Sequence, residues 1–102
     1  MKVLVIEDNI ELLKDIKSFL EEEGYICEIA PSYRAANDKI GFFPYDILVV
    51  DITLPDGNGL DLIREVKKEN IEAGIIIISA KNAIGDKIHG LEIGADDYLT
   101  KP

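Results

Sequence analysis

Short apolar runs alternate with helical patterns along the chain. The runs cover residues 3–6, 25–30, 47–50 and 75–78, with a shorter one around 98–99. Three of them are continuous and rich in Val and Ile, which is typical of strands covered on both faces. The pattern therefore predicts five short strands buried in one sheet.

Four segments between these runs carry apolar residues at helical spacing, near residues 10–20, 35–40, 60–70 and 84–91. Gly24 is the predicted stop of the first helix, and Ser32 is the predicted N-cap of the second. The third helix, from about residue 60 to 70, should turn Leu60, Ile63 and Val66 inward. The fourth pattern is weaker because it contains two glycines, each costing up to ~1 kcal/mol relative to Ala.

Strands that alternate with helices predict an α/β fold, in which helices lie on both faces of a doubly wound, five-stranded parallel sheet. The sequence stops at residues 101–102, directly after the fifth strand, with no fifth helix. We therefore expect one domain over residues 1–102, truncated after strand 5, with one face of the sheet only partly covered.

The composition of the chain excludes several classes of function. Twenty acidic residues against eleven Lys and Arg give a net charge of −9, which repels the phosphate backbone of nucleic acids. No apolar stretch approaches the roughly 20 residues that span a bilayer, and the acidic N-terminal region is no signal peptide. Cys27 is the single cysteine, so an internal disulfide is impossible. We expect a cytoplasmic protein that binds neither nucleic acid nor membrane by itself.

Polar side chains follow the predicted strands at the points where they end. Glu7 and Asp8 follow the first strand, Asp51 the third, Ser79 the fourth and Lys101 the fifth. Because ligands of doubly wound sheets bind beyond the carboxyl ends of the strands, these side chains should meet at one functional edge.

Three neighbouring carboxylates repel one another, and a divalent cation relieves that repulsion. Mg²⁺ prefers one or two carboxylates together with waters and phosphate oxygens. Asp8 and Asp51 fit as direct ligands, the backbone carbonyl of Thr53 could be a third, and Glu7 could hold a metal-bound water.

The same edge carries the groups needed to form an aspartyl phosphate. Lys101 is a point cation and Ser79 a hydroxyl donor for phosphoryl oxygens, with Asp51 as the nucleophile. Each residue taken singly is more often structural than functional; the acidic pair, for example, could belong to a helix N-cap region. The turn "LPDGNG" is interpreted as a shaped loop around the metal, with Gly57 and Gly59 permitting positive φ.

Four segments together resemble a response-regulator receiver domain of two-component signalling: "VLVIEDN", "DILVVDITLPDGNG", "IIIISAK" and "GADDYLTKP". The longer segment "KIHGLEIGADDYLTKP" is similar to the branch whose receivers precede a winged-helix DNA-binding domain. The resemblance implies a flavodoxin-like strand order, 2-1-3-4-5. It also implies a phosphoryl group received on Asp51 from a sensor histidine kinase.

The resemblance assigns the remaining roles as well. Glu7 and Asp8 would be the acidic pair, and Mg²⁺ would bind Asp8, Asp51 and the Thr53 carbonyl. Ser79 would be the switch hydroxyl, Tyr98 the switch aromatic and Lys101 the phosphate-contacting lysine, with a cis peptide before Pro102. Receivers catalyse their own phosphorylation and dephosphorylation. The chain would therefore be a signalling switch that controls an output, namely transcription, and not an enzyme on a separate substrate.

The switch would move the fourth helix and fifth strand, and Gly85 and Gly90 would lower the cost of that motion. Without a fifth helix, we expect exposed apolar surface and self-association through that face. Tyr33, Phe42, Phe43 and Tyr45 are interpreted as core or rim packing. His89 is assigned no role.

Three other functions stay open on the sequence. A phosphatase of the haloacid-dehalogenase type would need a second acid two residues after the nucleophile, where Thr53 stands. A flavodoxin-like FMN module would need a phosphate loop where Glu7 and Asp8 stand, and these would repel the cofactor. A phosphorylation-independent interaction module is disfavoured only because the full reactive set is present.

Overall fold

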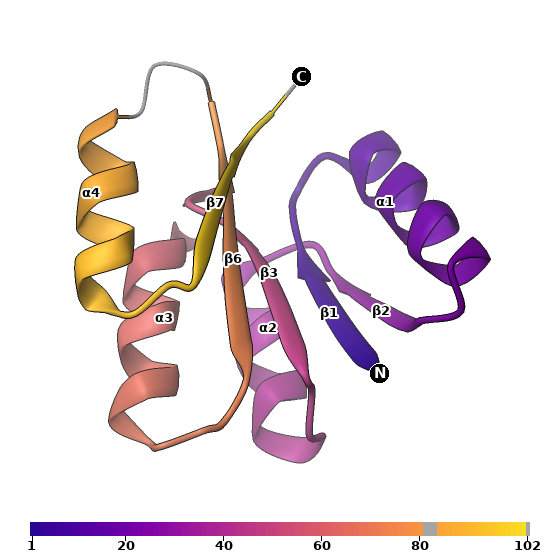
Figure 1. The fold of residues 1–102 in the computed structure, drawn as a ribbon, viewed down its shortest axis with the longest axis horizontal. Coiled ribbons are helices and arrows are strands. Elements are labelled where there is room, and N and C mark those ends of the chain that lie inside the picture. The colour runs from indigo at the N-terminus through magenta and orange to yellow at the C-terminus, as the bar shows by residue number, and fades with distance from the viewer. Residues whose placement is uncertain (81–83, 102) are drawn as a thin grey trace.

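The computed structural model describes residues 1–80 and 84–101. Within them the main sheet is parallel throughout and has the order β2-β1-β3-β6-β7. Its strands are β1 (Lys2–Ile6), β2 (Ile26–Ala30), β3 (Ile47–Asp51), β6 (Gly74–Ser79) and β7 (Asp97–Thr100). The predicted five-stranded, doubly wound sheet is confirmed (Figure 1).

The four helices are α1 (Ile10–Glu22), α2 (Tyr33–Phe42), α3 (Gly59–Lys68) and α4 (Ile84–Ile93). Ser32 caps α2 as predicted, since its side chain accepts a hydrogen bond from the Ala35 amide at 3.1 Å. Gly24, with φ of 92°, follows the end of α1. The third helix was predicted two residues too long, because Asn70 has φ of 55° and cannot continue a right-handed helix.

The two faces of the sheet are covered unequally. The larger buried cluster lies between the sheet and the helices α2, α3 and α4; it includes Leu60, Ile63 and Val66 of α3, as predicted. On the other face α1 packs over β1 and β2, where Leu13 meets Val3 and Val5 (Figure 1).

Beyond α1 that second face carries an apolar groove of ≈ 490 Å³. It is lined by Val3, Phe19, Leu20, Glu23, Tyr25, Ile47, Val49 and Ile76. Phe19 is 61% exposed. The predicted partial cover of one face is therefore confirmed for the described residues.

A small hairpin that the sequence did not predict follows β3. In it β4 (Thr53–Leu54) pairs antiparallel with β5 (Gly57–Asn58). The predicted positive φ at Gly57 and Gly59 is wrong, because the described glycines with positive φ are Gly24 and Gly94. A close approach explains them instead: a Cβ on Gly57 would lie 2.8 Å from Cδ2 of Tyr33, and one on Gly59 would strike the Asp51 carbonyl oxygen.

The four aromatic residues assigned to packing behave differently from one another. Tyr45 is buried and Tyr33 half-buried. Phe42, the last residue of α2, is 83% exposed, so the packing prediction is wrong for it. Phe43 is 48% exposed, and its ring lies at a centroid distance of 6.5 Å from that of Phe42.

No described helix is long and apolar enough to cross a bilayer. The predicted cis peptide before Pro102 lies outside the described residues.

Candidate functional site

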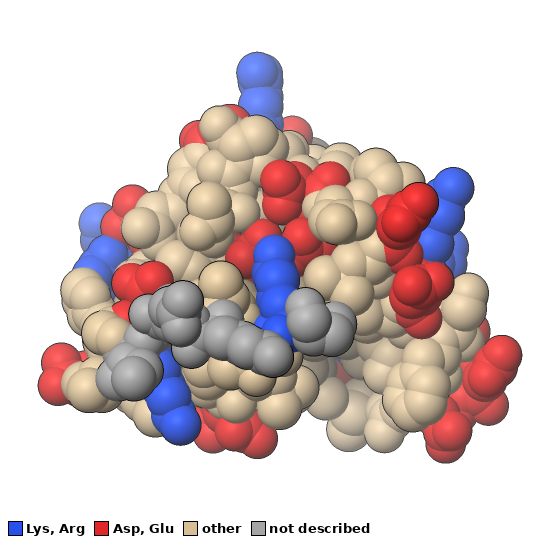
Figure 2. Space-filling model, turned by 90° about the horizontal axis from the view of Figure 1, so that it is seen from above, with Lys and Arg blue, Asp and Glu red and all other residues tan. Residues whose placement is uncertain are grey.

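The carboxyl ends of the central strands bring the predicted site residues together. Glu7 and Asp8 follow β1, Asp51 is the last residue of β3, and Lys101 follows β7. Figure 2 faces this edge of the molecule and shows acidic side chains gathered around its centre, with a basic side chain among them. The predicted convergence of these residues at one edge is confirmed.

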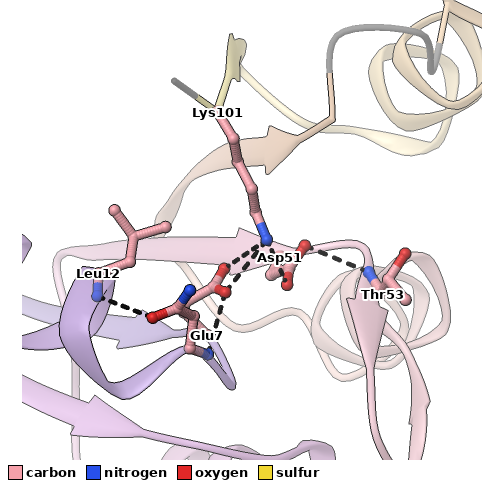
Figure 3. Close-up of polar contacts among 6 residues, drawn as sticks. Glu7, Leu12, Asp51, Thr53 and Lys101 are labelled. Atoms are coloured by element: carbon pink, nitrogen blue, oxygen red, sulfur yellow. Dashed lines mark hydrogen bonds and ion pairs between the residues drawn. The ribbon is translucent and has the colours of Figure 1, made fainter.

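The Lys101 ammonium joins two buried carboxylates (Figure 3). Its Nζ lies 3.0 Å from Oδ2 of Asp51, 3.1 Å from Oε1 of Glu7 and 3.0 Å from Oε2 of Glu7. Glu7 is 0% and Asp51 2% exposed. Such carboxylates are rarely buried unless they are paired, so this one cation balances much of their charge.

The pKa directions follow from that arrangement. Burial raises the pKa of Glu7 to about 7, the hydrogen bond from Lys101 opposes the rise, and the nearby Asp51 adds to it. Burial alone would lower the pKa of Lys101, but its hydrogen bonds to Asp51 and Glu7 and their charges outweigh burial, so this pKa is raised. One ammonium is therefore an incomplete partner for two buried carboxylates.

The cluster has a suitable donor set for a divalent cation. Carboxylate oxygens of Glu7, Asp8 and Asp51 lie within 4.8 Å of one another. Oε2 of Glu7 is buried and, although 3.0 Å from the Lys101 ammonium, receives no hydrogen bond from the described residues. An all-oxygen set with an unsatisfied buried oxygen and an exposed carboxylate, Asp8, fits Mg²⁺ and its retained waters.

Local backbone contacts orient the two buried carboxylates. The Thr53 amide donates to Oδ1 of Asp51 at 3.3 Å (Figure 3), and the Asn9 amide donates to Oε1 of Glu7 at 3.2 Å. The Asn9 side chain also caps α1 by accepting from the Leu12 amide at 3.1 Å. The sequence analysis missed Asn9, although an Asn directly before an apolar helical pattern is an N-cap signal.

Ser79 and Tyr98 occupy their predicted elements. Ser79 is buried at the end of β6, and its backbone carbonyl accepts from the Lys101 amide at 2.7 Å. Tyr98 pairs with Ile77 across β6 and β7, is half-buried against the larger core, and lies under Nζ of Lys87 at 5.6 Å. Their roles as switch residues, and that of Thr53 as a carbonyl ligand, stay predictions.

His89 has a contact that the sequence could not reveal. Its Nε2 lies 2.7 Å from Nη2 of Arg64, whose Nη1 donates to Asp61 at 2.6 Å. This set bridges α4 and α3 on the surface.

Residues 3–102 match the family described as the response regulator receiver domain. The chain is 37% identical over 102 residues to the transcriptional regulatory protein PmrA of Pectobacterium parmentieri, covering 100% of this chain and 46% of the relative. It is 35% identical over the same length to the transcriptional regulatory protein BasR of Escherichia coli K12, again covering 46% of the relative. The chain thus spans about half the length of the curated relatives it matches.

Solved structures agree with this similarity. A Francisella response regulator receiver domain superposes with a TM-score of 0.92 at 39% identity, over 99% of this chain and 84% of that one. A Burkholderia pseudomallei response regulator, solved with a phosphorylated aspartic acid and a calcium ion, has a TM-score of 0.91 at 29% identity, over 99% of this chain and 59% of that one.

Proposed function

The chain belongs to the response regulator receiver domains, and from that premise we propose that it accepts a phosphoryl group on Asp51 in a Mg²⁺-dependent reaction. The observation that carries the proposal is the buried Asp51 carboxylate, held at 3.0 Å by Lys101 within a cluster of three acids. The exposed acid Asp8 beside it supplies a second carboxylate for a bound cation.

The proposed donor is the phosphohistidine of a sensor histidine kinase. An Asp51 oxygen attacks phosphorus and forms the new P–O bond, while the P–N bond breaks and its electron pair stays on the imidazole. Bound Mg²⁺ would neutralise charge on the phosphoryl oxygens. Asp8, Asp51 and the Thr53 carbonyl would hold the ion, and Glu7 would hold one of its waters.

Lys101 has a second task in this reaction. Its ammonium bridges the two buried carboxylates in the structure, and its flexible stem lets it follow the phosphoryl oxygens once Asp51 is modified. Ser79, at the end of the neighbouring strand β6, would donate its hydroxyl to another phosphoryl oxygen. The chain would thereby catalyse its own phosphorylation, and with water as acceptor its own dephosphorylation, without acting on a separate substrate.

The added charge, about −1.5 to −2 at pH 7, would bias a two-state switch. We propose that Ser79 moves toward the phosphoryl group and that Tyr98 turns into the space it leaves, shifting α4 and β7. Since the relatives PmrA and BasR are transcriptional regulators more than twice as long, the chain would act in the cytoplasm as the receiver part of a longer regulator with a winged-helix DNA-binding domain.

Intact mass after incubation with acetyl phosphate tests this proposal, with and without Mg²⁺. The wild type should gain one phosphoryl group only when Mg²⁺ is present, and Asp51→Asn, which keeps the shape of the side chain, should gain none. An unchanged wild-type mass in folded protein would contradict the proposal and favour a phosphorylation-independent interaction module. Turnover of a phosphomonoester would instead favour a phosphatase.

A further inference from the structure

Asp56 ties the loop after Asp51 to a distant helix. Its carboxylate accepts from the Tyr33 amide at 2.7 Å and from the Arg34 amide at 3.0 Å, both in the first turn of α2. The hydrogen bond from the Arg34 amide lowers the pKa of Asp56, so the group is a carboxylate at neutral pH. An anion at this end of a helix also interacts favourably with the helix dipole.

The tied loop is the hairpin of β4 and β5. Asp56 lies in its turn, between Leu54 and Gly57. Gly57 lies against the ring of Tyr33, so closely that a Cβ there would come within 2.8 Å of Cδ2. At the open end of the hairpin, the Gly59 amide donates to the Ile52 carbonyl at 2.7 Å. The hairpin is therefore fixed both to α2 and to the segment that follows β3.

The same hairpin begins at the candidate metal site. Its first residue, Thr53, donates its amide to Oδ1 of Asp51 at 3.3 Å (Figure 3). The position of the hairpin therefore sets the place of the Thr53 backbone and, together with Lys101 on Oδ2, the orientation of the Asp51 carboxylate. Partners of this kind, which hold ligands without touching the metal, commonly change metal affinity by about 10- to 100-fold.

We propose that Asp56 is a positioning residue for the Mg²⁺ site, acting through the hairpin on Asp51 and on the Thr53 carbonyl. The proposal rests on the Mg²⁺-dependent function proposed for Asp51. It assigns the acid of the "LPDGNG" turn to the first turn of α2 and not to the metal.

A purely structural role for Asp56 would be to cap α2, and the chain offers a matched control for it. Ser32 caps the same helix end through its own side chain, which accepts from the Ala35 amide at 3.1 Å. The hydrogen bond of the Ser32 side chain lies within α2, so its loss should weaken α2 without releasing Thr53. The two residues separate capping from positioning.

The test compares wild type, Asp56→Ala, Asp56→Asn and Ser32→Ala. Mg²⁺ affinity is measured by calorimetry on the unphosphorylated protein, and the Mg²⁺ dependence of the acetyl phosphate reaction is followed by intact mass. Asp56→Ala should bind Mg²⁺ about 10-fold more weakly, with the reaction rate at saturating Mg²⁺ retained. Asp56→Asn, which keeps one acceptor oxygen, should lie between Asp56→Ala and wild type.

Ser32→Ala should lower the thermal midpoint about as much as Asp56→Ala does, yet keep the Mg²⁺ affinity of wild type. Equal Mg²⁺ affinity in wild type and both Asp56 variants would overturn the proposal. So would an equal loss of affinity in Ser32→Ala, since α2 itself would then be the cause.

A wild type that takes up no phosphoryl group is a different outcome: it contradicts the function of Asp51, whatever the Asp56 variants do. If Asp56→Ala does not fold, the comparison of Asp56→Asn with Ser32→Ala decides.

Discussion

At the scale of single residues, Lys101 is the cation on which the two buried carboxylates depend. Its ammonium lies 3.0 Å from both Asp51 and Glu7, and its own side chain is 27% exposed. Breaking a buried ion pair by removing one partner is costly because the other charge is left without compensation.

We predict that Lys101→Met lowers the metal-free unfolding free energy by about 2 kcal/mol, less than for a fully buried pair because the lysine is partly solvated. Mg²⁺ should restore part of the loss by replacing the missing positive charge. Urea unfolding with and without Mg²⁺ measures both effects, and Lys14→Met, an exposed lysine of α1, is the control. Equal stability of Lys101→Met and wild type without Mg²⁺ would show that the contacts of Lys101 do not stabilise the fold.

Tyr45 and Glu28 form a second polar contact, at the opposite side of the sheet from α1. The Tyr45 hydroxyl donates to Oε1 of Glu28 at 2.7 Å, and Lys2 lies 3.0 Å from Oε2. The hydrogen bond from Tyr45, followed by that from Lys2, lowers the pKa of Glu28 below its usual 4.5. A lowered pKa in the folded state stabilises the protein above the unfolded-state pKa, and this contribution is lost as the pH falls through the folded-state pKa.

Tyr45→Phe should therefore cost about 1 kcal/mol of unfolding free energy at pH 7. The difference from wild type should shrink as the pH falls below 4.5, where Glu28 becomes protonated. Urea unfolding at several pH values measures it, with Tyr33→Phe as a control for loss of a tyrosine hydroxyl. A difference that grows toward low pH would have the wrong sign for this contact.

At the scale of elements, the two glycines of α4 differ in the space that surrounds them. A Cβ on Gly90 would strike Cδ1 of Ile77 in β6, so Gly90 is required by the close packing of α4 on the sheet. For Gly85 no described atom beyond its chain neighbours and the surrounding helix backbone lies within 4 Å of the Cβ position. The hypothesis that both glycines ease motion of α4 can therefore be tested without disturbing the packing only at Gly85.

We predict that Gly85→Ala raises the unfolding free energy by up to ~1 kcal/mol, through helix propensity alone. Gly90→Ala should lower it by about 1–2 kcal/mol, because the added methyl overpacks the contact with Ile77. Urea unfolding of the two variants measures the contrast. If Gly90→Ala were as stable as Gly85→Ala, the tight contact between α4 and β6 would be refuted.

The elements themselves were largely predictable from the sequence, because strands buried on two faces have to be apolar throughout. Thus Val3–Ile6 and Ile47–Val50 were placed within one residue of β1 and β3. The β4–β5 hairpin was not predictable, since each of its strands has two residues and no periodicity. Gly57 and Gly59 looked like turn residues, while their actual constraint is contact with Tyr33 and Asp51, which only the folded chain brings near.

The grouping of the candidate site residues was also predictable from the sequence. Parallel strands dictate that the residues at their carboxyl ends meet, so Glu7, Asp51 and Lys101 could be grouped without coordinates. The tie of Asp56 to α2 spans 22 and 23 residues and depends on where the hairpin lies, so no local pattern encodes it.

At the scale of the whole molecule, the apolar groove beside α1 is the main unsatisfied surface. Its lining combines the half-buried strand residues Ile47 and Val49 with the exposed Phe19. Contiguous apolar surface of this kind is typical of sites that bind another protein surface.

We predict that the chain self-associates through this groove as its concentration rises. Phe19→Glu should weaken the association, because a carboxylate would have to be desolvated at the contact. Phe42→Glu is the matched control, since Phe42 is exposed but does not line the groove. Sedimentation velocity over a wide concentration range measures it, and a wild-type chain that stays monomeric throughout would contradict the prediction.

The most direct test of the central claim is to locate the phosphoryl group within the chain. After acetyl phosphate and Mg²⁺, borohydride reduction converts an aspartyl phosphate to homoserine, which tandem mass spectrometry of peptides can place. The account predicts homoserine at position 51 alone, absent without Mg²⁺. Modification at Asp8 or another acid with Asp51 intact, or none in folded protein, would contradict it.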